Sequence, residues 1–113
     1  MHAADTNAEL LSLMQEQGDD LAAPRDIDFF VIFATRPQAE AFAGLAAAAL
    51  ELPARVASWE KTDKWQVSLT RHMAPEHAQL NQLEKRIAAL ARQHGGDADG
   101  WGCPRVSRDT GLR

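Results

Sequence analysis

Residues 27–33, Ile-Asp-Phe-Phe-Val-Ile-Phe, are the stretch of sequence that decides the fold. All of them except Asp28 are aromatic or β-branched, and these residue types are enriched in β-strands. A nearly continuous apolar run of this length predicts a strand that is buried on both faces and therefore lies in the middle of a sheet. Because side chains alternate along a strand, we expect Phe30 and Ile32 on the face opposite to the odd-numbered residues.

A helix is predicted on each side of this strand. Before it, leucines and a methionine recur at helical spacing within residues 1–17, and Gly18 with its acidic neighbours ends the pattern. After it, Thr35 and Gln38 form a capping-box pattern, which opens an alanine-rich helix that runs to about Leu50. The central strand is thus expected to lie between two helices in the chain.

The second half of the chain predicts two more strands, a helix and a last strand. Residues 54–60 have strand composition, residues 61–63 form a short polar turn, and residues 64–72 alternate between apolar and polar side chains. A third helix opens at residues 73–76 and is closed by the glycines at 95 and 96. The last strand is expected at about residues 100–106.

The order of these elements predicts the fold class. Without the first helix the order is βαββαβ, which is the ferredoxin-like split unit. Right-handed crossovers then place both long helices on one face of a four-stranded antiparallel sheet. We therefore expect an α+β ferredoxin-like sandwich with an additional N-terminal helix, as a single domain over residues 1–113. The second face of the sheet has no helix assigned to it, apart from the N-terminal one.

Composition narrows the classes of function. The chain is 45% hydrophobic and 25% charged, which is normal for a globular domain. Its single cysteine excludes an internal disulfide framework and fits a reducing compartment. The formal net charge of −4 gives no general attraction for nucleic acid, and no apolar run is long enough to span a bilayer. We expect a cytoplasmic protein that binds neither nucleic acid directly nor a membrane.

Groups that could carry chemistry are scattered along the chain. None of the four histidines has a second ligand three or four residues away on a predicted helix, as a metal site would need. Cys103 has no histidine or lysine beside it in sequence and is better explained as a small buried strand residue. The aspartate pairs at 19–20 and 97–99 lie in turns, where aspartate commonly bonds the local backbone. We therefore predict no enzyme activity, no metal and no cofactor.

The uncovered face of the sheet is the predicted partner-binding surface. Phe30 and Ile32 are the apolar side chains that the central strand offers to it. Two coverings stay open at this point. One is the N-terminal helix, packing through Leu10, Leu11 and Met14, and the other is a protein partner or a second copy of the chain.

Two tryptophans flank the predicted turn between the second and third strands. If residues 61–63 form the loop, Trp59 lies opposite Trp65 on the same face of the sheet. Such a pair is either core beneath the helices or an aromatic anchor at a protein interface. Should the register differ by one residue, Trp59 becomes a further candidate for partner binding.

The most specific local string is Asp99-Gly100-Trp101-Gly102, which follows the two glycines that close the third helix. Glycine on both sides of a large indole permits close backbone approach and unusual dihedral angles. The ring itself can fill a gap between helix and sheet. We assign a structural role to these four residues and expect Trp101 to be mostly buried.

A helix, a short acidic turn and then Asp-Gly-Trp-Gly resembles the regulator of ribonuclease E activity B family. Residues 10–33 also resemble the opening of that family, and the βαββαβ order matches its ferredoxin-like fold. The resemblance implies a non-catalytic protein that binds the regulatory half of the endoribonuclease and restrains messenger-RNA decay. Members known as inhibitors carry a long acidic C-terminal tail, which would suit a basic, disordered partner.

The present sequence departs from the family at its end. Residues 107–113 are Ser-Arg-Asp-Thr-Gly-Leu-Arg, which we expect to form a flexible tail without that acidic character. The resemblance is therefore to a divergent member that lacks the acidic tail.

Two classes of function remain open from the sequence. One is a regulator that binds a protein, with ribonuclease E as the candidate partner, and the other is a small-molecule-binding or dimeric ferredoxin-like sensor module. An apolar pocket closed by the protein itself would favour the sensor, and a flat exposed apolar patch would favour the protein partner.

Overall fold

The structure of the chain is a computed structural model that describes residues 6–59 and 62–103. Within these residues the elements follow the predicted order. They are α1 (Thr6–Glu16), β1 (Arg25–Phe33), α2 (Arg36–Leu50), β2 (Ala54–Ser58), β3 (Trp65–Met73), α3 (His77–Gln93) and β4 (Asp97–Gly102). None of the helices in this part of the chain is long and apolar enough to cross a membrane.

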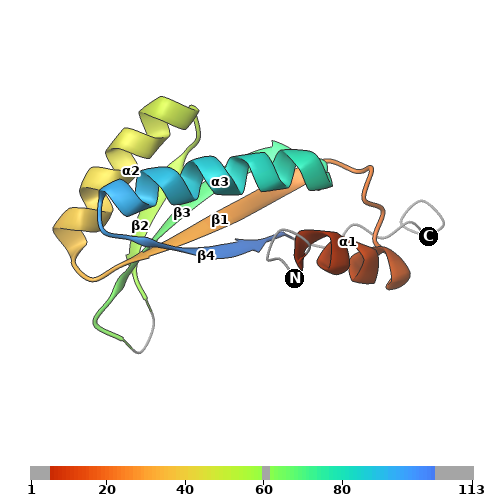
Figure 1. Cartoon of the computed structure of the whole chain (residues 1–113), viewed down its shortest axis with the longest axis horizontal. Coiled ribbons are helices and arrows are strands. Elements are labelled where there is room, and N and C mark those ends of the chain that lie inside the picture. The colour runs from red at the N-terminus through yellow and green to blue at the C-terminus, as the bar shows by residue number, and fades with distance from the viewer. Residues whose placement is uncertain (1–5, 60–61, 104–113) are drawn as a thin grey trace.

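The strands form one antiparallel sheet in the order β2-β3-β1-β4. The long helices α2 and α3 lie together on one side of this sheet (Figure 1). This arrangement confirms the α+β ferredoxin-like fold with an added N-terminal helix. It also confirms the central place of β1, which pairs with β3 on one side and with β4 on the other. The prediction that β1 is buried on both faces is wrong, because Asp28 and Phe30 on its second face are only half-buried.

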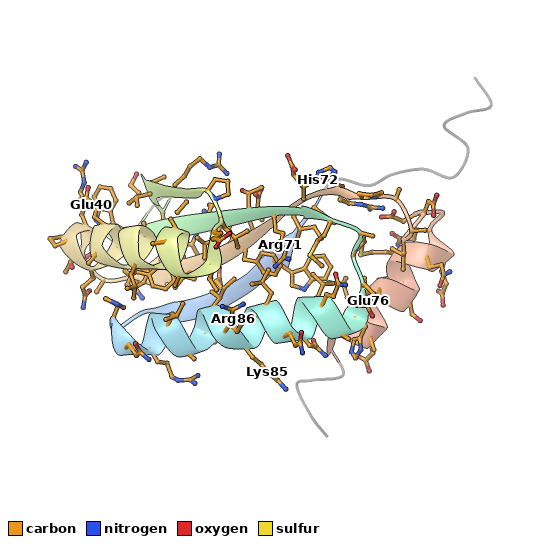
Figure 2. All side chains as sticks on the ribbon, turned by 90° about the horizontal axis from the view of Figure 1, so that it is seen from above. Glu40, Arg71, His72, Glu76, Lys85 and Arg86 are labelled. Carbon is orange, nitrogen blue, oxygen red and sulfur yellow. The ribbon has the colours of Figure 1, made fainter. Side chains whose placement is uncertain are left out.

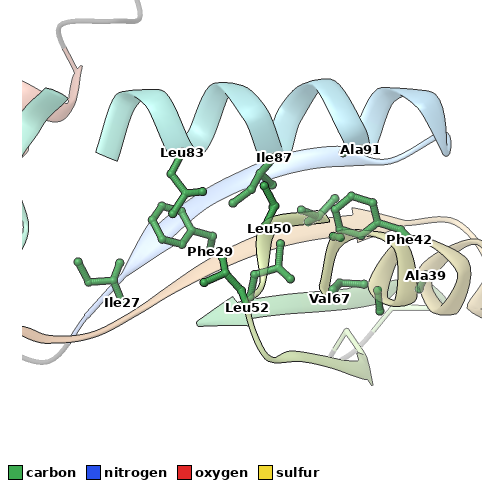
Figure 3. Packing of buried hydrophobic residues seen from close by; sticks show 14 of the residues in the cluster. Ile27, Phe29, Ala39, Phe42, Leu50, Leu52, Val67, Leu83, Ile87 and Ala91 are labelled. Atoms are coloured by element: carbon green, nitrogen blue, oxygen red, sulfur yellow. The ribbon is translucent and has the colours of Figure 1, made fainter. Parts of the chain in front are cut away.

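The core lies between the sheet and the two long helices (Figure 3). The odd-numbered residues of β1 from Ile27 to Phe33 are all fully or almost fully buried on this side. Alanines at the inner face of α2, Ala39 and Ala46, have no exposed surface and let the helix approach the sheet closely. The rings of Phe33 and Phe42 pack in a tilted pair with centroids 5.1 Å apart.

Both long helices begin at side-chain caps. The Thr35 hydroxyl accepts a hydrogen bond from the backbone N–H of Gln38, as the capping pattern predicts. The Glu76 carboxylate accepts hydrogen bonds from the backbone N–H groups of Ala78 and Gln79, which satisfies two of the free donors at the start of α3.

The prediction for the last strand is wrong at its start. The strand β4 begins at Asp97, three residues before the predicted position, and residues 104–106 lie outside the described part. A β-bulge opposite Phe30 explains why residues 97–102 lack the pattern of a regular strand, since the pairing register shifts between Phe29 and Val31. Gly100, with φ at 93°, supplies the left-handed conformation inside this bulge.

The predicted pairing of the two tryptophans is also wrong. Ser58, not Trp59, lies opposite Trp65, and the backbone N–H of Trp59 donates to the Lys64 carbonyl oxygen at 2.9 Å. The connection between paired residues therefore spans residues 60–63 and not 61–63. A shift of one residue moves a side chain to the other face of a sheet, so Trp59 and Trp65 point to opposite sides.

Candidate partner-binding surface

We call the side of the sheet opposite to α2 and α3 the open face. The register of the strands places alternate residues of each strand on it. They are Asp26, Asp28, Phe30 and Ile32 of β1; Gln66, Ser68, Thr70 and His72 of β3; Arg55 and Ala57 of β2 with Trp59 after it; and Asp97 and Gly102 of β4. No helix of the described residues lies across this face (Figure 1).

The N-terminal helix packs elsewhere, so of the two coverings that the sequence left open for this face, the helix is not the one used. It lies against α3, beyond the end of β4 (Figure 1). Leu11 is buried in the main core, whereas Leu10 and Leu13 are 38% and 49% exposed. Its apolar residues therefore extend the core at one end of the molecule and leave the sheet uncovered.

A polar contact that sequence reasoning missed holds α1 in this place. Asn7 is only 8% exposed, and its Nδ2 donates hydrogen bonds to Asn81 Oδ1 and Glu84 Oε1, both at 2.7 Å. Its Oδ1 accepts a hydrogen bond from the indole Nε1–H of Trp101 at 3.0 Å. We call these four residues the Asn7 hub, and it joins α1, α3 and β4.

The Asp-Gly-Trp-Gly string places its tryptophan in this hub. Trp101 lies opposite Phe29, on the side of the sheet that carries the core, and its half-buried ring packs against the core cluster. Gly102 falls on the open face, where the Phe30 ring lies within ordinary contact distance of the position a Cβ would take. The Asp-Gly-Trp-Gly string thus places the indole against α1, and Gly102 leaves the edge of the open face without a side chain.

The three residues predicted to bind a partner differ in exposure. Trp59 is 36% exposed, Phe30 is half-buried, and Ile32 is only 8% exposed. A shallow hollow crosses the open face beside them. It is lined by Phe30, Arg55, Val56, Ala57, Gln66 and Ser68. Trp59 and Phe30 are therefore the apolar groups that a molecule on this face would meet, while Ile32 has little surface to offer.

Charge on the open face is mainly negative. The Asp26 carboxylate lies 3.0 Å from the His72 ring nitrogen Nδ1. The Asp28 carboxylate accepts a 2.5 Å hydrogen bond from the Thr70 hydroxyl and lies 4.0 Å from the Arg55 guanidinium. With the exposed Asp97 at the β4 edge, the described residues of the face include three carboxylates, against the cations of Arg55 and of Lys64, which pairs with Trp59.

One acidic position has a different role from that expected. Asp19 was predicted in a solvated turn, but it is 2% exposed and forms a buried ion pair with Arg25 at 2.8 Å. The pair brings the end of α1 and the start of β1 together. An arginine at the first position of a strand carries no sequence signal for such a partner, which explains why the pair was missed.

Cys103 is half-buried just after β4, so the prediction of a buried strand residue is wrong. Desolvation by burial raises the pKa of its thiol, although the neighbouring Arg25 opposes the shift. A raised pKa keeps the group as a thiol at neutral pH and makes it a poor nucleophile.

The side chains that could bind a metal ion lie apart from one another in the described part of the chain. No three histidine, cysteine, aspartate or glutamate side chains there come close enough together to hold a metal ion. A pocket of about 270 Å³ lies in the seam beside α1, lined by residues that include Leu10, Met14, Trp101 and Cys103. It is the apolar hollow that a sensor function would use.

Fold and surface together define the class: a ferredoxin-like α+β protein with an added helix at one end and one sheet face free of helices. Residues 4–103 match the family model described as regulator of ribonuclease activity B. The chain therefore belongs to this family, whose function is to regulate ribonuclease activity, and the resemblance to the family that the sequence indicates is confirmed. No curated protein matches the chain.

Proposed function

We propose that this chain regulates a ribonuclease by binding it, that the partner is the regulatory half of ribonuclease E, and that the chain is not itself an enzyme. Membership of the regulator family supports the target class. The observation that carries the binding mode is the open face, which holds Trp59 and Phe30 without a covering helix in the described residues. The protein acts in the cytoplasm, where messenger RNA is degraded.

The aromatic groups supply the apolar part of the contact. Tryptophan is enriched among the residues that dominate binding energy at protein interfaces. Trp59 stands at the β2–β3 hairpin, and the hollow lined by Phe30 and Ala57 lies beside it on the same face. This hollow is open and not enclosed, which suits an apolar side chain of a partner better than a small molecule held by the protein alone.

The carboxylates supply the polar part and define the partner chemistry. Asp26, Asp28 and Asp97 border the apolar groups on two strands, so a segment with lysine or arginine residues would complement the face. We therefore propose that a basic segment of the partner lies across the open face with an apolar side chain against Trp59 and Phe30.

Binding of the purified regulatory half of ribonuclease E, measured by isothermal titration calorimetry, tests this proposal. Trp59→Ala should weaken binding at least about tenfold, the equivalent of about 1.4 kcal/mol. Leu45→Ala is the matched control, because Leu45 is a 42% exposed apolar residue on α2, on the other side of the sheet.

Each outcome has a distinct meaning. If the unmodified protein does not bind the regulatory half, ribonuclease E is not the partner. If it binds and Trp59→Ala matches Leu45→Ala, the contact lies away from the open face. Self-association in sedimentation that Trp59→Ala abolishes, without ribonuclease binding, would show that a second copy of the chain occupies the face.

A further inference from the structure

A second surface feature lies on the other side of the sheet, between β3 and α3. A groove of about 290 Å³ is lined there by residues Arg71, Met73, Gln79, Gln82, Leu83 and Arg86. Figure 2 shows Arg71 on β3 and Arg86 on α3 on facing sides of the space between strand and helix. The groove is separated from the open face by the sheet itself.

The helix presents its groove residues as one stripe. Gln79, Gln82 and Arg86 recur at spacings of three and four residues, so they project from the same side of α3. Leu83, which is 3% exposed, lies in this stripe and forms an apolar floor. Arg71 belongs to the core side of β3, but it lies near the strand end and is exposed. Polar donors therefore surround a small apolar base.

Neither arginine has an acidic partner in the described part of the chain. The ion pairs in the described part of the chain involve Arg25, Arg36, Arg55 and His72. Glu84, the acidic residue within α3, is held by Asn7, and Glu76 caps the start of the helix. Two guanidinium groups thus face one groove without a carboxylate between them, and each would be stabilised by a shared anion.

We propose that this groove binds a phosphate group, either as inorganic phosphate or on a small phosphorylated molecule such as a nucleoside monophosphate. A guanidinium offers a planar fork of N–H donors that matches phosphate oxygens in a bidentate manner. Arg71 and Arg86 grip the phosphate from opposite walls, and the side-chain amides of Gln79 and Gln82 donate further hydrogen bonds. The groove volume is just below the usual range for small-molecule sites, which limits the ligand to a small one.

Titration of the full chain with inorganic phosphate, adenosine monophosphate and adenosine, followed by amide chemical shifts in NMR, tests this site. Saturable shifts clustered at residues 71–73 and 79–86 are expected with both phosphate-bearing probes, and none with adenosine. Equal affinity for the two phosphate probes identifies free phosphate as the ligand, and a higher affinity for the nucleotide identifies a phosphorylated molecule.

Charge variants decide whether the groove is responsible. The double variant Arg71→Gln with Arg86→Gln should weaken binding at least tenfold, and each single variant should weaken it by less. Lys85→Gln is the matched control, because Lys85 is next to Arg86 in sequence but points away from the groove (Figure 2). Thermal denaturation shows that each variant is folded, which is expected because these side chains are exposed.

Two results would overturn the proposal. Shifts that rise linearly with phosphate and never saturate would show general electrostatic attraction in place of a site. Equal weakening by Lys85→Gln and by the double variant would show the same. Neither result would bear on ribonuclease binding, which is measured with a different ligand on the opposite side of the sheet.

Discussion

At the scale of single residues, the buried ion pair between Asp19 and Arg25 is the most demanding interaction in the structure. Their side chains are only 3% and 2% exposed, so both charges have left water. The Arg25 guanidinium donates to both Asp19 carboxylate oxygens, at 2.8 and 3.0 Å, and to the backbone carbonyl oxygens of Asp20 and Ala23. Such dense pairing offsets the desolvation cost that a lone buried charge would impose.

Removing one partner of this pair should therefore destabilise the fold strongly. We expect Asp19→Asn to lower the free energy of unfolding by about 3–5 kcal/mol, because it leaves the Arg25 charge buried without compensation. Urea denaturation measures the loss. Glu40→Gln, which breaks the exposed Arg36–Glu40 pair, should cost only about 0.3–0.5 kcal/mol. Equal losses in the two variants would mean that Asp19 and Arg25 are exposed to water in solution.

At the scale of elements, sequence patterns predicted which helices and strands exist, but not where α1 lies or how β2 meets β3. Apolar periodicity and caps such as Thr35 act locally, so they can be read along the chain. The place of α1 depends on Asn7, whose partners are 74 to 94 residues away. The side of the sheet on which Trp59 lies depends on the length of the turn between β2 and β3, because a difference of one residue there moves the side chain to the other side.

The Asn7 hub gives a prediction at this scale. Asn7→Ala removes three hydrogen bonds, so α1 should detach locally while the sheet stays intact. Hydrogen exchange should accelerate at the amides of residues 11–16, with little change in β1 and β3. Trp101→Phe, which keeps a ring but removes the Nε1–H donor, should cost about 1 kcal/mol and give a smaller acceleration. Unchanged exchange in α1 with Asn7→Ala would show that Leu11 alone holds the helix.

At the scale of the whole molecule, the sheet separates two surfaces of opposite charge. The open face has three aspartates among its described residues, together with Trp59 and Phe30, and the groove between β3 and α3 has Arg71 and Arg86. The formal net charge of −4 describes neither surface, since it averages over both. The sequence predicted the open face, from Phe30 and the expected fold. The groove could not be predicted from the sequence, because β3 and α3 come together there only after folding.

This separation predicts how the protein should associate with a basic partner. Exposed charges mainly set the association rate and its dependence on salt. The double variant Asp26→Asn with Asp97→Asn should therefore slow association with the regulatory half of ribonuclease E. It should also reduce the amount by which the association rate falls between low salt and about 0.15 M salt, where the Debye length is about 8 Å. The double variant Arg71→Gln with Arg86→Gln is the control, since its charges lie beyond the sheet and should leave the low-salt rate no slower. Surface plasmon resonance measures both rates. If the aspartate variant associates as fast as the unmodified protein at every salt concentration, the partner does not approach through the acidic open face.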